Sequence, residues 1–397
     1  MTAAATPKWK AGRPDVLLLA LTVTLVVAGL VVVYSSSFVI SLVRFGEPTH
    51  YIMRQMIWAT LGAVFMILAI RTDYRMLRPL AVPLMLGTIG MLVAVLVIGQ
   101  EAHGAQRWIG VGSLTVQPAE FAKLTIIIYM AAWLSSKGEN VKSIEQGLVP
   151  FVIIMGAVAT LIMMQPNMGT TLIILGIAVT MFWAAGASIW QLGSLVVVGG
   201  GTMTMLALAE GYRLQRLMTF LNAEADPDGY GFQTLQALIA MGNGGFSGLG
   251  LGASRSKFFY VPESHTDGVF AIIGEELGLI ATVAIVCIFM LFMVRGYQVA
   301  LRARDDFGAL LAVGVTTWVV LQALMNIGGI TRVIPLTGVP LPFLSFGGNA
   351  VAALLMGVGV LLSVSRYARP PGDPPENGGS NEASEPPGGR IVRRKRS

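Results

Sequence analysis

Charge is what this chain has least of. Only 12% of its 397 residues are Asp, Glu, Lys or Arg, about half of the roughly 25% found in soluble domains. Its one cysteine, Cys287, lies inside an apolar run, which excludes an intramolecular disulfide and a multi-cysteine metal site. The chain also lacks a Walker loop and a Gly-x-Gly-x-x-Gly motif that opens a helix after a strand. These absences argue against a soluble nucleotide-binding enzyme.

Apolar residues are abundant and fall in long runs. They make up 54% of the chain, and the mean hydropathy is +0.71. Runs of about 17–26 residues match the length of a membrane-spanning helix, so the sequence predicts an all-α polytopic membrane protein with about ten transmembrane helices. The first run is longer than a signal-peptide core and lacks a clear cleavage site, so we expect it to be retained. The predicted spans are 16–40, 52–70, 79–99, 119–135, 148–165, 170–186, 190–209, 269–294, 307–328 and 346–365.

The distribution of Lys and Arg predicts the orientation. With a cytoplasmic N-terminus, 18 of the 27 basic residues lie inside and nine lie outside or at the outer membrane edge, as the positive-inside rule requires. Both termini are then cytoplasmic, and a large extracellular loop, 210–268, joins spans seven and eight. The net charge of +6 is a topology signal in this interpretation, and no nucleic-acid partner is expected.

Three regions follow from the composition: a cytoplasmic N-terminal segment (1–15), a membrane domain (16–366) and a tail (367–397). The tail is rich in Pro, Gly, Ser and Asn and ends in Arg393-Arg394-Lys395-Arg396. Such a composition predicts disorder. Its basic end is expected to lie against anionic lipid of the inner leaflet.

The densest charge in the chain lies between Lys257 and Glu276, at the start of span eight. Asp267 at the helix mouth is a candidate general base, since a partly desolvated carboxylate among like charges has a raised pKa. His265 is the competing candidate. The alternative is that Ser264, Thr266 or Asp267 only caps the helix. Glu275 lies two turns further on, as a cavity-lining or structural carboxylate.

Other polar groups are expected on the same side of the membrane. Glu120 and Lys123 share one face of span four, as a structural ion pair or as a charged pair lining a polar cavity. Arg107 and Arg54 are either interfacial anchors or groups that bind a diphosphate. The glycine-rich stretch 244–252 follows a short helix expected in or near the membrane, and we interpret it as a flexible or re-entrant loop.

Six motifs in order resemble the SEDS family, the FtsW/RodA polytopic peptidoglycan glycosyltransferases, over about 15–366. They are Tyr34-Ser-Ser-Ser37, Gly104-Ala-Gln-Arg107-Trp-Ile-Gly, Gln117-Pro-Ala-Glu120-Phe-Ala-Lys123, Gln165-Pro-Asn-Met-Gly-Thr170, Pro262-Glu-Ser-His-Thr-Asp267 with Gly274-Glu-Glu-Leu-Gly278, and Leu341-Pro-Phe-Leu-Ser-Phe-Gly-Gly348. Lys257-Phe-Phe-Tyr-Val-Pro262 looks more like the FtsW branch than RodA. The chain departs from the family at Asn167, where aspartate is common, and at Gly268, where a bulky residue is common.

The resemblance implies that Asp267 occupies the catalytic aspartate position and that Glu120 and Lys123 face the same cavity. It also implies a lipid II substrate, an undecaprenyl-diphosphate-linked glycan, a class B penicillin-binding protein as transpeptidase partner and other divisome proteins. The expected location is the bacterial cytoplasmic membrane, at the division septum, with the active site facing outward.

The mechanism expected is glycosyl transfer in which Asp267 accepts the proton of the attacking sugar hydroxyl. Positive charge must stabilise the leaving diphosphate. The candidates are Arg107, Arg213, Arg216, Arg255 and Lys257. No organic cofactor is expected, and a divalent cation, Mg²⁺ or Mn²⁺, is a further candidate for this task. The alternatives are a lipid II flippase or transporter, a non-catalytic divisome scaffold, and an elongation-type polymerase.

Overall fold

The computed structural model describes residues 9–102, 105–111, 114–209, 218–222 and 230–369. Within them, every apolar run predicted as a span forms a helix, because a helix satisfies its backbone hydrogen bonds internally. The α-helices are α1 (Val16–Phe45), α2 (His50–Arg71), α3 (Leu77–Ile98), α4 (Pro118–Lys137), α5 (Val149–Met163), α6 (Met168–Ala184), α7 (Ile189–Ala209), α9 (Tyr230–Gly244), α10 (Val269–Arg302), α11 (Asp306–Ile330) and α12 (Gly348–Tyr367). Shorter helical turns are Tyr74–Met76, Gly138–Lys142 and Ile144–Leu148.

The predicted all-α membrane class is confirmed, and the number of spans remains a prediction. Seven of the described helices are long and apolar enough to cross a membrane: α1, α2, α3, α5, α10, α11 and α12, with α3 and α5 counted together with the helical turns before them. Helix α6 and the Ile189–Thr202 part of α7 are apolar but shorter. Helix α4 lies outside both groups; it carries Glu120 in its first turn, Lys123 in its second and Lys137 in its last.

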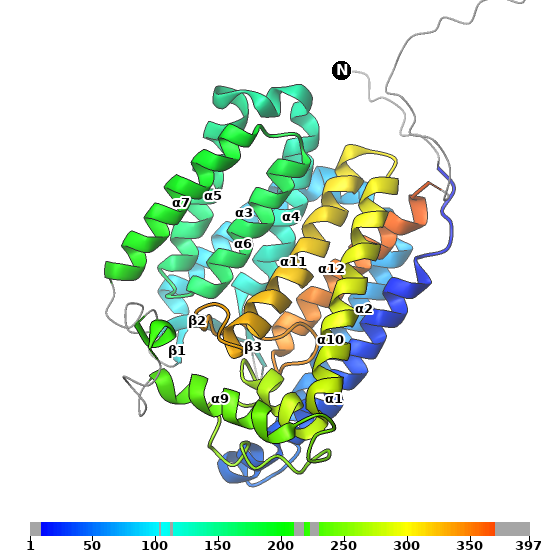
Figure 1. The fold of residues 1–397 in the computed structure, drawn as a ribbon. Helices are drawn as coiled ribbons and strands as arrows, with labels where there is room; N and C mark the ends of the chain where they lie inside the picture. The colour runs from blue at the N-terminus through cyan, green and yellow to red at the C-terminus, as the bar shows by residue number, and fades with distance from the viewer. Residues whose placement is uncertain (1–8, 103–104, 112–113, 210–217, 223–229, 370–397) are drawn as a thin grey trace, which may run out of the picture.

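Helices α11 and α12 form the centre of the bundle. The apolar window of α11 is 72% buried and that of α12 is 89% buried, against 22% for α10. Small residues allow α12 to approach α2 closely. A Cβ atom at Gly348 would lie 2.1 Å from the ring of Trp58, and one at Gly359 would lie 2.8 Å from the backbone of Met66. The other helices surround this pair (Figure 1).

Three short antiparallel strands were not predicted from the sequence. They are β1 (Gln100–Ala102), β2 (Ala105–Val111) and β3 (Leu114–Val116), in the order β1-β2-β3. Trp108 pairs with Gln100, and Ile109 pairs with Val116. This sheet lies at the same end of the bundle as α9, which crosses that end (Figure 1). The predicted loop around Arg107 is therefore a small sheet, built by pairing between neighbouring segments.

Helix α10 is broken near its start, where the sequence predicts one continuous span. Gly278 has φ 74° and ψ −172°, a conformation that favours glycine. The break is bridged by the glycine-rich loop after α9. The amides of Leu279 and Ile280 donate to the carbonyls of Gly245 and Phe246, at 2.9 and 3.3 Å. This pairing attaches the long connection before α10 to α10 itself.

A buried ion pair holds the same connection from its other side. The Lys257 ammonium lies 3.1 Å from the Glu276 carboxylate, and both side chains are almost completely buried. Glu276 also accepts a hydrogen bond from the Ser35 hydroxyl of α1 at 2.7 Å. Glu275 accepts from the Ser254 hydroxyl at 2.5 Å and from the backbone amide of Arg255 at 3.2 Å. The two glutamates thus bind the segment 254–257 to α10.

The Lys257–Glu276 pair yields a stability prediction. Replacing Glu276 by Gln leaves the Lys257 ammonium buried without its counter-charge, and the expected loss is about 3–5 kcal/mol of unfolding free energy. The double variant Lys257→Met/Glu276→Gln removes both charges and should recover part of that loss. Thermal unfolding of the purified protein in detergent measures both. A double variant that is less stable than Glu276→Gln alone would contradict this account of the pair.

Candidate active site

A cavity of about 830 Å³ lies at the end of the bundle that carries the sheet. Its wall combines strand β2 with the first turns of α2, α4, α6 and α12. The turn before α10 and the proline-rich segment 331–347, which joins α11 to α12, complete it. The predicted site residues Asp267, His265, Glu120, Arg54 and Arg107 all line it. The structure therefore brings together residues that are more than 200 positions apart in the chain.

Asp267 lies in a turn whose backbone is tied on both sides. The carbonyl of Glu263 accepts hydrogen bonds from the amides of Thr266 and Gly268, at 3.1 and 3.0 Å. Asn326 of α11 donates from Nδ2 to the Asp267 carbonyl at 2.9 Å, and the Thr266 hydroxyl lies 2.8 Å from Asp267 Oδ1. These contacts hold the Asp267 carboxylate at the cavity wall.

The predicted helix cap is not formed by Ser264, Thr266 or Asp267. Helix α10 begins at Val269, and the residue at its N-cap is Gly268. The Thr266 hydroxyl instead contacts Glu263 and Asp267. The sequence could not separate these alternatives, because the position of a helix start is uncertain by one or two residues.

His265 is buried between aromatic rings. Its ring centroid lies 4.7 Å from that of Tyr51 and 5.8 Å from that of Phe346, and its backbone carbonyl accepts from the Phe346 amide at 2.8 Å. Burial lowers the pKa of His265 below its ordinary 6.5, Glu263 opposes the shift, and Arg44 reinforces it. His265 thus shapes the wall next to Asp267.

The Glu120–Lys123 pair combines both roles that the sequence left open. Lys123 Nζ lies 2.8 Å from Glu120 and 3.2 Å from Gln322 Oε1 of α11, and it stands over the Trp318 ring at 5.4 Å. Glu120 lines the cavity, whereas Lys123 lies behind it with only 1% of its side chain exposed. The buried ammonium therefore holds the Glu120 carboxylate at the wall.

Arg107 reaches from β2 to the turn between α5 and α6. Its Nε donates to the Gln165 carbonyl at 2.9 Å, and its guanidinium also donates to the Pro166 carbonyl. Asn167 accepts from the Thr170 amide at 3.3 Å and so caps α6. An amide oxygen suffices for this cap. The turn thus fixes Arg107 in the cavity wall.

Three other predicted residues lie away from the described cavity wall. Glu275 and Lys257 are buried in the contacts between α10 and the segment 254–257. Arg255, in the same segment, has an exposed side chain. Arg213 and Arg216 lie outside the described residues. Of the five predicted diphosphate ligands, the cavity wall therefore includes Arg107.

Two further charged residues of the wall were not proposed as site residues. Arg44, near the end of α1, and Glu263, in the turn before Asp267, both line the cavity. Arg44 precedes a tight connection from α1 to α2, and Arg54 follows it. That spacing places both arginines at the same membrane edge. From the sequence, it could have been used to predict that Arg44 lies near Arg54. The wall therefore carries three arginines, Arg44, Arg54 and Arg107, and three carboxylates, Glu120, Glu263 and Asp267.

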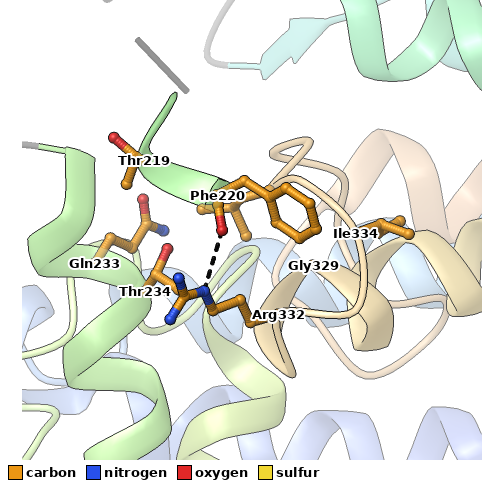
Figure 2. A pocket seen from close by; sticks show the side chains of 8 residues that line it. Thr219, Phe220, Gln233, Thr234, Gly329, Arg332 and Ile334 are labelled. Atoms are coloured by element: carbon orange, nitrogen blue, oxygen red, sulfur yellow. Dashed lines mark hydrogen bonds between the residues drawn. The ribbon is translucent and has the colours of Figure 1, made fainter. Parts of the chain in front are cut away.

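A smaller pocket lies beside the cavity, between the segment 218–221, α9 and the end of α11 (Figure 2). Arg332 donates from Nε to the Phe220 carbonyl at 3.2 Å across it. Ile334 and Leu336 line both pockets. The proline-rich segment 331–347 between α11 and α12 therefore forms the wall between the two.

Comparison with known proteins assigns the family. A family model described as a cell cycle protein, FtsW/RodA/SpoVE, matches residues 15–370. The chain belongs to this family. Stage V sporulation protein E of Bacillus subtilis is 41% identical over 362 residues, covering 91% of this chain and 99% of that protein. The probable peptidoglycan glycosyltransferase FtsW of Geobacter metallireducens is 39% identical over 355 residues, covering 89% and 95%.

Solved structures of the family share the fold. A chain from a peptidoglycan synthase complex, described as coordinating polymerization and crosslinking, matches with a TM-score of 0.71 at 25% identity, covering 89% of this chain and 98% of that one. The rod shape determining protein RodA of Thermus thermophilus matches with a TM-score of 0.65 at 25% identity, covering 90% and 98%. The resemblance stated from the sequence motifs is thus confirmed.

The buried pair Lys123–Glu120 has an exposed counterpart, which allows a matched comparison. Lys123→Met leaves the Glu120 carboxylate buried without its partner, and we expect a loss of about 3–5 kcal/mol of unfolding free energy. Lys142 pairs with Glu139 at the same spacing, but 58% of the Lys142 side chain and 88% of that of Glu139 are exposed. Lys142→Met should leave the unfolding free energy nearly unchanged. Thermal unfolding of both variants in detergent measures the two shifts. Equal shifts for the two variants would contradict the structural role of Lys123.

His265 makes stability depend on pH. Because its pKa is lowered in the folded protein, the unfolded chain binds a proton below about pH 6.5 that the folded chain does not. We therefore expect the unfolding free energy to fall as the pH is lowered through 6.5. The slope should not exceed the one expected for uptake of a single proton on unfolding. Thermal unfolding between pH 7.5 and 5.5 should show a smaller decline in His265→Asn than in the wild type. Equal declines would rule out His265 as a source.

Proposed function

We propose that this chain polymerises lipid II into glycan strands at the outer face of the bacterial cytoplasmic membrane. The observation that carries the proposal is the cavity wall: a carboxylate held by a tied turn, Asp267, shares it with Arg44, Arg54 and Arg107. A base and several cations are what a glycosyl transfer with a diphosphate leaving group requires. Relatives at 37–39% identity are named probable peptidoglycan glycosyltransferases, which supports the assignment.

Asp267 is the proposed general base. The sugar hydroxyl of lipid II attacks the anomeric carbon of the growing glycan, which is linked to undecaprenyl diphosphate. Its proton passes to the Asp267 carboxylate as the new glycosidic bond forms. The bond between the anomeric carbon and the diphosphate oxygen breaks, and that oxygen keeps the electron pair. Because His265 is buried between Tyr51 and Phe346, we assign it a positioning role.

The arginines of the wall are proposed to bind the diphosphate. Guanidinium groups match phosphate oxygens in charge and geometry. Arg107 is held by the carbonyls of Gln165 and Pro166, so its position is set before the substrate binds. Glu120 and Glu263 line the same cavity and are placed to accept hydrogen bonds from sugar hydroxyls.

A divalent cation does not find a complete protein site among the described residues. No three His, Cys, Asp or Glu side chains there converge as metal ligands. Mg²⁺ or Mn²⁺ is usually held by a few carboxylates together with phosphate oxygens, so a cation would have to arrive with the diphosphate. The steps proposed above do not involve it.

The partner proposed is a class B penicillin-binding protein, together with other divisome proteins. One structural neighbour belongs to a complex described as coordinating polymerization and crosslinking, which supports a transpeptidase partner. Relatives named FtsW are 37–39% identical to this chain, whereas the solved RodA structure is 25% identical, which favours septal synthesis over elongation. Expression in a bacterium depleted of its own FtsW or RodA tests this preference. The expected result is rescue of division rather than of rod shape.

A flippase is the rival function, since a membrane cavity with charged walls would serve transport as well. A transporter is expected to place its ionic groups at the membrane midplane on broken helices. Here the charged residues of the cavity wall come from elements that meet at one end of the bundle, which favours the enzyme. If purified protein moves lipid II across liposomes and makes no glycan polymer, transport is the activity.

Replacement of Asp267 by Asn tests the base. With lipid II and the transpeptidase partner, polymer formation should fall by about 10²- to 10⁴-fold, because a neutral amide cannot accept the proton. Asn keeps an oxygen for the Thr266 contact. The matched control is Asp306→Asn, at the exposed start of α11 on the opposite end of the bundle, which should polymerise like the wild type.

The comparison has a clear negative outcome. If Asp267→Asn, eluting as a folded monodisperse protein, polymerises lipid II at the wild-type rate, the assignment of the base is wrong. If both Asn variants lose activity equally, the loss reflects the preparation and says nothing specific about Asp267.

A further inference from the structure

The loop after α9 exposes apolar side chains, and its own sequence carries no charge. No charged residue lies between Tyr230 and Ser254, yet Phe246 is 76% exposed and Leu251 60%. An exposed apolar cluster on a soluble surface usually marks a binding surface. The proposed function makes no use of this loop, and the sequence left it as flexible or re-entrant.

Two contacts between α1 and α10 define levels along the bundle against which the loop can be placed. Asp15 pairs with Arg295 at 2.9 Å, and Ser35 bonds Glu276 at 2.7 Å. The two levels are separated by about 20 residues of the continuous helix α1, or about 30 Å at 1.5 Å per residue. That distance equals the thickness of the hydrocarbon core, about 30 Å. The two contacts are therefore about one membrane thickness apart.

The loop lies between these two levels. Leu279 and Ile280 follow Glu276 toward the other level by three and four residues, or about 5–6 Å. Their side chains are 51% and 68% exposed, as expected for lipid-facing positions. Because their amides bond the carbonyls of Gly245 and Phe246, the loop backbone at 245–246 lies at this depth.

The loop backbone is suited to such a position, since polar groups in hydrocarbon must be bonded within the protein. The amides of Leu249 and Gly250 donate to the carbonyls of Glu275 and Glu276, at 3.0 and 2.9 Å, and the Gly248 amide donates to Gly244. Gly248 has φ 80°, and a Cβ atom there would lie 2.2 Å from the Glu276 carbonyl. Close pairing with α10 thus requires glycine.

We propose that residues 244–251 form a re-entrant loop inserted into the membrane leaflet next to the cavity, with Phe246 among the lipid acyl chains. The apolar surface of the loop continues the lipid-facing surface of α10 through Leu279 and Ile280, and this continuity identifies hydrocarbon as its occupant. The insertion fixes the depth of the connection that leads to Asp267. The proposal does not depend on the proposed function.

Site-directed spin labelling of the full chain in lipid nanodiscs tests the depth. Cys287 is the chain's one cysteine, so a Cys287→Ser background allows single labels. A nitroxide at Phe246→Cys should be more accessible to oxygen, which partitions into lipid, than to a water-soluble nickel chelate. The lipid reference is Ile280→Cys, and the water reference is Glu47→Cys, in the exposed connection between α1 and α2.

The outcomes separate lipid from other occupants. A label at 246 that resembles the one at 280 supports insertion. A label that resembles the one at 47 overturns the proposal, and so does a label that is protected only after the transpeptidase partner is added, since the occupant is then a protein. Leu251→Cys provides a second position if the Phe246 variant does not fold, with the same result expected.

Discussion

The placement of the whole site depends on how α10 is broken at Gly278. In a membrane, a break in a helix frees backbone amides that no water can bond. Here the glycine loop after α9 supplies the carbonyls of Gly245 and Phe246. This exchange attaches the connection before α10 to the helix, and the Lys257–Glu276 pair secures it. The turn that carries Asp267 lies between these attachments and the start of α10.

The cavity contains charged side chains that are positioned before substrate binds, and fixed partners reduce the free-energy cost of burying them. Two charged groups of the wall have fixed partners, a carbonyl pair for Arg107 and an opposite charge for Glu120. Lys123 stands behind Glu120, and Arg107 is held by the turn between α5 and α6. In a region of low dielectric, such fixed partners reduce the cost of burial. They also set the geometry before substrate arrives.

Much of the fold was predictable, because a helix in a membrane is decided locally. All ten apolar runs are helical, as is the short helix α9. The three strands were missed because they form by pairing across turns. The short polar sequence between spans three and four does not indicate such pairing. The break at Gly278 was missed because its partners lie more than 30 residues away, in the loop 244–250.

The site residues also fall into those that the sequence predicted and those that only the tertiary structure placed. Composition and motifs were enough to predict a membrane enzyme and to single out Asp267, Glu120, Arg54 and Arg107, all of which line one cavity. Only the tertiary structure decided that Lys257 and Glu275 serve the attachment of a loop and that Arg44 joins the wall. The reason is physical: residue type determines what a side chain can do. Which partner it meets depends on the path of the backbone and on the neighbours that compete for its charge.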